Sequence, residues 1–417
     1  MLSSDEKRKE EWETVNKGAA LWSRPKTEIT EEEYKQFYTN ISYDSEAPLV
    51  TLHNRVEGNL EYISLLFIPS KAPFDLWDRE QRHGINLYVR RIFILDDAKY
   101  LMPSYLRFVR GVVDAADLPL NVSREFLQNN KNIDRIRTAS VKKVLNELKR
   151  IAENDPDTYA QFWKEFGKVL KEGMVEDQEN QKPLVKLLRF CTTHDDEETQ
   201  TVSLADYVKR MPMKQKGIYF VTAESYAAAS SSPHLEIFRK NNIEVLLLTD
   251  PVDEWLVTSL SNYEEKSLKS IAKGALDLDE FTSDDQKKAA EEKGKDLAGL
   301  VEKIKAVLGD RVKEVRVSHR LTDSPACLVA DEHDLGGNLE RILQAMGQDA
   351  PDAKPIMEIN ADHPLIKQLA PEHERLEEWS MVLFDQAALS EGARLSEPAA
   401  YVKRVNDLLA RASLLTT

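Results

Sequence analysis

Hydrophobic and polar residues recur along this chain with two different periods, and its first part predicts two strands followed by two helices. Residues 60–69 alternate and then become wholly apolar, and residues 87–95 are rich in the β-branched and aromatic side chains that strands prefer. Apolar residues then recur at spacings of three and four over 133–153 and 159–170, which is typical of amphipathic helices. An Asp-Pro-Asp break at 155–157 separates the two helices.

A smaller unit of strands and helices follows. Residues 217–221 and 243–248 are short apolar runs of the kind that form buried strands. Between them, residues 223–229 are a helix candidate with Thr222 as the expected N-cap. Because strands that are separated by helices usually pair in parallel, this part predicts a parallel sheet.

Two polar stretches are interpreted as connections. Residues 5–20 favour a leading helix or connecting arm, and residues 274–294, acidic and then mixed in charge, are the expected linker. Beyond the linker we expect a helix, two strands and a terminal pair of amphipathic helices, at 297–308, 312–317, 326–329, 373–389 and 397–409. The whole pattern predicts a mixed α/β (α+β) fold.

The composition narrows the class of protein. A chain of 417 residues has room for two or three domains. Its formal net charge of -15 argues against nucleic acid as a partner, because such binding depends on neutralising phosphates. No apolar run approaches the roughly 20 residues that span a bilayer, and the polar start is unlike a secretory signal, so we expect no membrane partner. With only Cys191 and Cys327 present there is no disulfide framework, which favours the reducing cytoplasm.

No metal site is predicted. Cys191 and His194 could supply two ligands, but structural zinc needs four, and no second pair with ligand spacing follows. The acidic run at 195–198 lacks the spacing and the glycine of a calcium-binding EF-hand loop. We therefore expect these acidic side chains to be solvated.

The most specific chemical signal lies at residues 118–131, where a loop enters a predicted helix. Arg124 and Gln128 are four residues apart, so they share one helix face. A guanidinium can bind a terminal phosphate bidentately while a neighbouring amide orients a water molecule. Yet the chain has neither of the common Gly-rich phosphate-binding loops, so it predicts only half of a nucleotide site. The alternative is that Arg124 simply pairs with Glu125 or another neighbour.

The same stretch is one of several segments that the chain shares with a known family. In this sequence they are 21–25 (LWSRP), 67–76 (FIPSKAPFDL), 87–91 (LYVRR), 108–114 (FVRGVVD), 118–128, 186–190 (KLLRF), 206–211 (DYVKRM) and 244–250 (EVLLLTD). Through them the chain resembles the heat-shock protein 90 chaperones in their bacterial form, high-temperature protein G. Because the matching segments are many and widely separated, the resemblance is highly specific.

The family has an N-terminal ATP-binding domain, a middle domain and a C-terminal dimerisation domain, and the resemblance covers only the last two. It implies a fragment that binds no cofactor and is no enzyme by itself, whereas the full-length protein would use ATP and Mg²⁺. In that protein, the resemblance implies that Arg124 reaches the ATP γ-phosphate when the N-terminal domain docks, and that Gln128 supports the same contact. The expected organisation is an arm (1–20), a middle domain with a large unit (21–200) and a small unit (201–273), a linker (274–294) and the dimerisation domain (295–417).

The resemblance implies that three groups of residues bind client proteins, the unfolded or partly folded chains on which chaperones act. The first is a proline-studded loop that displays large apolar side chains, the second follows a buried strand, and the third is the apolar stripe of a helix. The alternatives are that these residues cover the sheet, fill the space between domains, or pack on an ordinary core. The residues are Phe74, Leu76 and Trp77; Glu254 and Trp255; and Leu335, Leu339, Ile342, Leu343 and Met346.

The two terminal helices are expected to form a homodimer. The resemblance implies that they pair with their copies in a four-helix bundle, and the alternative is a hairpin that folds back within one chain. The expected dimerisation residues are Trp379, Leu383, Phe384, Ala387, Tyr401, Val405, Leu408 and Leu409. The function that follows is a dimeric chaperone fragment that holds clients. The alternative is a purely structural dimerisation scaffold without client affinity.

Overall fold

The computed structural model describes residues 19–77, 84–96, 98–119, 130–274, 292–332, 334–349 and 353–414. The chain divides into two compact units, Met1–Val169 and Leu170–Thr417. Both combine helices with β-sheets, which confirms the predicted mixed α/β class. Most of the predicted arm and nearly all of the predicted linker lie outside the described residues, and the domain boundaries remain a prediction.

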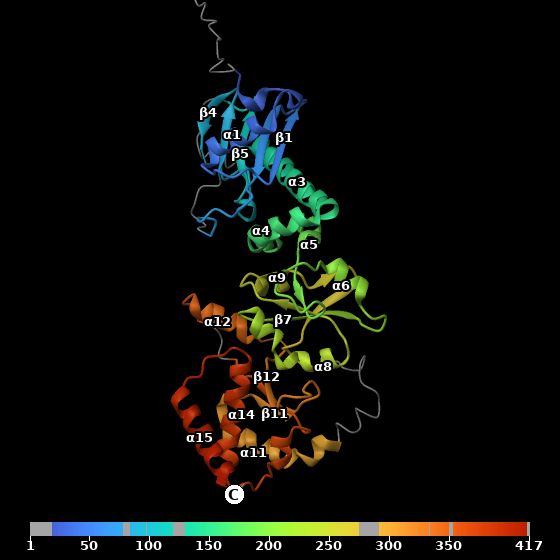
Figure 1. Ribbon diagram of the computed structural model, residues 1–417, viewed down its shortest axis with the longest axis vertical. Coiled ribbons are helices and arrows are strands. Elements are labelled where there is room, and N and C mark those ends of the chain that lie inside the picture. Colours follow the sequence, from blue (N-terminus) through green and yellow to red (C-terminus); the bar gives the residue numbers. More distant parts are fainter. Residues whose placement is uncertain are drawn as a thin grey trace, which may run out of the picture. The chain divides into compact units, whose positions relative to one another are not determined.

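The first unit is built on a five-stranded sheet, coloured blue to cyan in Figure 1. The strand order is β1-β2-β5-β3-β4, and β3 pairs with β5 in parallel while the other neighbours are antiparallel. Strand β2, between β1 and β5, is buried along nearly its whole length, which explains its apolar sequence. The strands are β1 (Val50–Val56), β2 (Tyr62–Ile68), β3 (Ile85–Val89), β4 (Ile92–Leu95) and β5 (Arg110–Ala115).

The prediction of one strand over 87–95 was wrong, because the chain turns back in its middle. Arg90 and Arg91 have positive φ angles of 50° and 68° and form the two-residue turn of a β3–β4 hairpin. The Arg91 backbone N–H donates to the Asp114 carboxylate at 3.1 Å, which helps to hold this turn. Glycine usually marks such turns, so the arginines gave no turn signal.

Helices cover the sheet of the first unit. Helix α1 (Glu31–Ser42) begins with a capping box of Thr30 and Glu33, and Tyr38 from this helix packs with apolar side chains of the sheet. The long helices α3 (Lys131–Asn154) and α4 (Pro156–Glu176) confirm the predicted helix pair. From α4, Phe162 and Phe166 place their rings 5.6 and 4.6 Å from that of Phe108.

The second unit begins with another five-stranded sheet, in the order β6-β8-β7-β10-β9. Strand β7 pairs in parallel with both of its neighbours, which confirms parallel pairing of the two predicted strands, but the edge strands β6 and β9 pair antiparallel, so the sheet is mixed. The predicted helix after β7 starts later than expected, because Ser225 rather than Thr222 accepts the capping hydrogen bond. The elements are β6 (Cys191–Thr192), β7 (Gly217–Thr222), β8 (Val245–Leu248), β9 (Asn262–Tyr263), β10 (Lys266–Ser270), α5 (Gln181–Leu187), α6 (Leu204–Arg210), α7 (Tyr226–Ser230), α8 (Glu236–Lys240) and α9 (Asp253–Ser259).

A three-stranded sheet in the order β11-β13-β12 completes the second unit. Its apolar core joins the sheet to α11 and α14, and α15 lies beside α14 (Figure 1). The elements are β11 (Glu314–Val317), β12 (Ala326–Val329), β13 (Ile356–Ile359), α11 (Ala298–Leu308), α12 (Gly337–Ala345), α13 (Pro364–Gln368), α14 (Leu376–Ser390) and α15 (Pro398–Leu414). In the part of the chain that the structure describes, no helix has the length and apolar composition needed to cross a membrane.

Candidate functional site

The two residues with the strongest chemical signal, Arg124 and Gln128, lie outside the described residues. The ranges described on either side of them contain no group of three or more His, Cys, Asp or Glu side chains placed to hold a metal ion. Cys191 is buried, and its thiol donates to the Glu198 carbonyl oxygen at 2.9 Å. Burial is the main reason that the pKa of this thiol is raised to about 11.

The proline-studded loop separates the three residues that were expected to act together. Phe74 is 97% exposed and Trp77 is also exposed, so both offer apolar surface to the solvent. Leu76 is 3% exposed and fills the interior, and its carbonyl oxygen accepts a hydrogen bond from Arg107 Nε at 2.7 Å. The loop therefore displays Phe74 and Trp77, while Leu76 anchors it.

Helix α9 is fixed in the second unit by a buried group of charges. Lys171, at the C-terminal part of α4, is completely buried. Its Nζ lies 2.8 Å from Asp250 Oδ2 and 2.9 Å from Asp253 Oδ1, and both carboxylates are buried as well. Burial by itself would lower the pKa of Lys171, but the two carboxylates outweigh it and raise this pKa. One cation faces two acids, so burial raises the pKa of Asp253 in spite of Lys171.

The residues that follow Asp253 on α9 were expected to contact clients. Glu254 is buried, and its carboxylate accepts a hydrogen bond from Asn338 Nδ2 of α12 at 2.7 Å. Trp255, the next residue, is half-buried. The side chain of Glu254 thus joins α9 to α12, and part of the Trp255 surface remains accessible beside it.

The apolar stripe around α12 stays incompletely covered in this chain. Leu335, Leu339, Ile342 and Leu343 are half-buried, and Met346 is exposed. Beside the helix lies a cavity of about 770 Å³, which is large enough for several side chains of a bound segment. Its lining mixes apolar and charged groups and includes Leu328, Leu335, Ile342, Ala388, Glu391 and Arg394.

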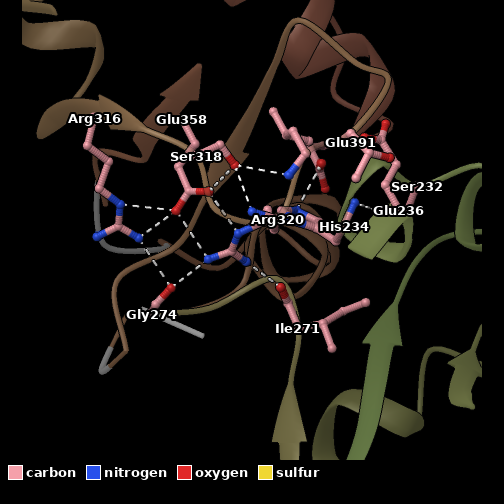
Figure 2. A network of polar contacts seen from close by, with 12 residues as sticks. Ser232, His234, Glu236, Ile271, Gly274, Arg316, Ser318, Arg320, Glu358 and Glu391 are labelled. Atoms are coloured by element: carbon pink, nitrogen blue, oxygen red, sulfur yellow. Dashed lines mark hydrogen bonds and ion pairs between the residues drawn. The ribbon is translucent and has the colours of Figure 1, made fainter. Parts of the chain in front are cut away.

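A network of charges ties the three-stranded sheet to the end of strand β10 (Figure 2). Glu358 of β13 accepts hydrogen bonds from Arg316 at 2.7 Å and from Arg320 at 2.8 Å. Arg320 is buried and also donates to the carbonyl oxygens of Ile271 and Gly274, at 2.5 and 2.8 Å. Burial acts to raise the pKa of Glu358, but Arg320 and then Arg316 outweigh it, and the pKa is lowered.

A second set of contacts joins the same two parts of the second unit, the one around its five-stranded sheet and the one around its three-stranded sheet. The Glu236 carboxylate of α8 accepts the backbone N–H groups of residues 322–324 at 2.6, 2.8 and 3.0 Å. Close by, Nε2 of the fully buried His234 lies 3.0 Å from Glu391 Oε1. Figure 2 shows these two side chains next to each other. Specific polar contacts therefore hold the five-stranded sheet of the second unit against its three-stranded sheet. The cavity beside α12 is lined by residues from both of these parts.

The terminal helices divide their apolar residues between the core and the surface. Leu383 and Ala387 of α14 belong to the apolar core, and Trp379 and Phe384 pack partly against it. In α15, Leu408 is buried, Tyr401 and Val405 are half-buried, and Leu409 is 62% exposed. Val402 and Leu389 are exposed too. Although α14 and α15 pack on each other, they leave apolar surface uncovered.

Comparison with known proteins identifies the family. A model of the Hsp90 protein family matches residues 3–415. The chain belongs to the Hsp90 family. Chaperone protein HtpG of Nitrosomonas europaea is 56% identical to it over 404 residues, which cover 96% of this chain and 63% of that protein. The HtpG proteins of Dechloromonas aromatica and Nitrosococcus oceani are 56% and 57% identical, with the same coverage.

These matches confirm the family that the sequence motifs predicted. The chain spans about 63% of the length of the curated relatives that it matches. The activity of these longer Hsp90 proteins as a whole is therefore only a proposal for this chain.

Sequence reasoning missed three polar residues that organise the site in this Hsp90 chain. Lys171 and Glu358 have partners 79 and 38 residues away, so no local pattern points to them. Asn338 did carry a signal. It lies three residues after Leu335 and four before Ile342, so it is a polar residue within the apolar stripe.

Proposed function

We propose that this chain is the client-binding and dimerising part of an Hsp90-type molecular chaperone. It would bind unfolded or partly folded proteins on the surface of α12 and Trp255, and the Phe74–Trp77 loop would offer a further apolar contact. A cytoplasmic setting is part of the proposal, because a chain with only two buried cysteines suits a reducing compartment.

The observation that carries the client-binding proposal is the incompletely covered apolar stripe of α12 beside a cavity of about 770 Å³, which Leu335 and Ile342 help to line. Unfolded chains expose apolar side chains, and burying these against Ile342 or Leu335 removes both surfaces from water. Charged groups in the cavity wall can form hydrogen bonds or ion pairs with polar residues of the bound client segment. A purely structural scaffold would have no use for apolar surface left open in this way.

Suppression of aggregation tests this proposal. Light scattering of a heat-denatured client is followed with the chain itself, with Trp255→Ala and with Phe93→Ala. Phe93 is an exposed aromatic residue on β4 that is not among the proposed client-binding residues, and it serves as the control. We expect the original chain and Phe93→Ala to suppress scattering, and Trp255→Ala to suppress it several-fold less. Equal scattering with and without the chain would favour the scaffold without client affinity.

The proposed dimer rests on the apolar surface that α14 and α15 leave open. Val402, Leu409 and Leu389 are exposed in the single chain, and pairing with a second copy would cover them. Isologous contact between two copies is the commonest way in which identical chains cover such a patch. The hairpin alternative leaves these three side chains in water.

Arg124 and Gln128 are proposed to act on ATP only in a longer protein. Arg124 would reach a γ-phosphate bound by an N-terminal ATPase domain, and Gln128 would support that contact. The sequence has neither of the common Gly-rich phosphate-binding loops, so the phosphate site would belong to the longer protein. The catalytic role thus rests on the sequence motif and on the family.

A further inference from the structure

Helix α12 buries a polar residue where an amphipathic helix normally buries an apolar one. Of its nine residues, all of them described, only Asn338 is buried, with 9% of its surface exposed. The neighbouring apolar residues Leu339, Ile342 and Leu343 stay half-buried. The docking of α12 therefore cannot be explained by a covered apolar stripe alone.

The buried amide faces a buried carboxylate. Asn338 Nδ2 donates to Glu254 Oε1 at 2.7 Å, a short distance that is typical of a hydrogen bond to a charged group. A buried carboxylate without donors is costly, because it has lost its hydration. Asn338 supplies a donor to Glu254, and the contact joins residues that are 84 positions apart in the chain.

The start of α12 has weak local support. Gly336 and Gly337 begin the helix without a side-chain cap hydrogen bond, and glycine loses more backbone freedom on folding than any other residue. Nine residues are also fewer than the roughly 12–15 that a marginally stable isolated helix needs. Just before the helix, Lys273 Nζ donates to the Asp334 carbonyl oxygen at 3.0 Å. Among the described residues, Asn338 then makes a side-chain hydrogen bond to another element, helix α9.

We infer that Asn338 is a positioning residue, whose amide docks the first turn of α12 on Glu254 of α9. Through this contact Trp255 and the stripe of α12 belong to one surface, a consequence that rests on the proposed client-binding function. The docking is polar and local, so α12 is released when the contact is broken, while the rest of the unit keeps its core.

Hydrogen exchange of the α12 amides, measured by mass spectrometry on the full chain without client, tests the inference. Asn338→Asp sets two carboxylates against each other, and adding Glu254→Gln restores a hydrogen bond of reversed direction. We expect exchange in residues 339–346 to be about 10- to 100-fold faster in Asn338→Asp, the range for losing a hydrogen bond to a charged group. The double variant should return to within about threefold of the original chain.

Gln344→Glu is the matched control, because it makes the same amide-to-acid change on the exposed side of α12. It places like charge near Glu340 and should change exchange no more than about twofold. Asn338→Ala removes the donor without adding charge. It replaces Asn338→Asp in the test if that variant disturbs the fold. The inference is overturned by either of two results: Asn338 variants that exchange no faster than Gln344→Glu, or a double variant as fast as Asn338→Asp. Since no client is present, these results are independent of whether the surface binds one.

Discussion

Replacing Lys171 by methionine should destabilise the second unit more than any surface change on the same helix. The lysine is completely buried between Asp250 and Asp253, with its Nζ 2.8 and 2.9 Å from their oxygens. At an effective dielectric constant of about 20, each attraction is worth about 6 kcal/mol before desolvation is counted. Methionine fills a similar volume but leaves two buried carboxylates without their cation. Breaking a buried ion pair in this way costs about 3–5 kcal/mol.

The expected loss can be read as a thermal shift. For a unit of this size, 1 kcal/mol corresponds to roughly 2–4 °C, so Lys171→Met should lower the melting temperature by about 6–20 °C. Lys164→Met is the control, since Lys164 is exposed on the same helix α4 and should change stability by less than about 0.5 kcal/mol. Calorimetry on the three chains at pH 7.5 provides the comparison.

The loss of stability in Lys171→Met should also depend on pH. Without Lys171, the folded-state pKa values of the two buried aspartates lie above their unfolded values near 3.9. The folded variant then binds more protons than the unfolded one, so its stability rises as the pH falls. We therefore expect the gap between the variant and the original chain to narrow from pH 7.5 to pH 5. A shift no larger than that of Lys164→Met, or a gap that does not change with pH, would refute the reasoning.

The remaining predictions concern the charge network around Glu358, the proposed dimer and the Arg124 motif. The pKa of Glu358 is lowered from 4.5, so its contribution to stability is present above that pH and is lost as the pH falls through the folded value. Calorimetry should show Glu358→Gln costing about 3–5 kcal/mol at pH 7 and progressively less below pH 4.5, and an equal cost at all pH values would contradict this. Sedimentation should show a dimer for the full chain and a monomer when residues 397–417 are deleted, and a deletion variant that stays dimeric would move the interface elsewhere. In a chain fused to an Hsp90 ATP-binding domain, Arg124→Ala should sharply lower ATP turnover without disturbing the dimer. Unchanged turnover would contradict the proposed role of Arg124 in ATP hydrolysis.

The strands and helices with a strong local pattern could be predicted from the sequence. Strand β2 is buried on both faces and is almost wholly apolar, and α3 and α4 show regular helical spacing. The β3–β4 turn could not be predicted, because Arg90 and Arg91 adopt a conformation that glycine or asparagine normally marks.

The sequence predicts the apolar stripe of the candidate site but not its polar contacts. The stripe of α12 follows from helical spacing, and of its residues Leu335 and Ile342 line the cavity. Which of the loop residues face the solvent depended on tertiary packing, so Phe74 and Leu76 were indistinguishable in the sequence but differ completely in exposure. The partners of Asn338 and Lys171 come from distant segments of the chain. A single sequence does not indicate which distant segments lie next to each other in the fold.

Site-specific cross-linking tests the central claim most directly. A photoreactive amino acid is placed at Ile342, which lines the cavity, and in a second chain at Phe93, which is exposed on β4. Each chain is irradiated with a permanently unfolded, reduced and carboxymethylated protein, and the adducts are quantified by mass spectrometry. The account predicts strong adducts at position 342 and few at position 93. Equal yields at the two positions, or more at position 93, would contradict a client site on α12.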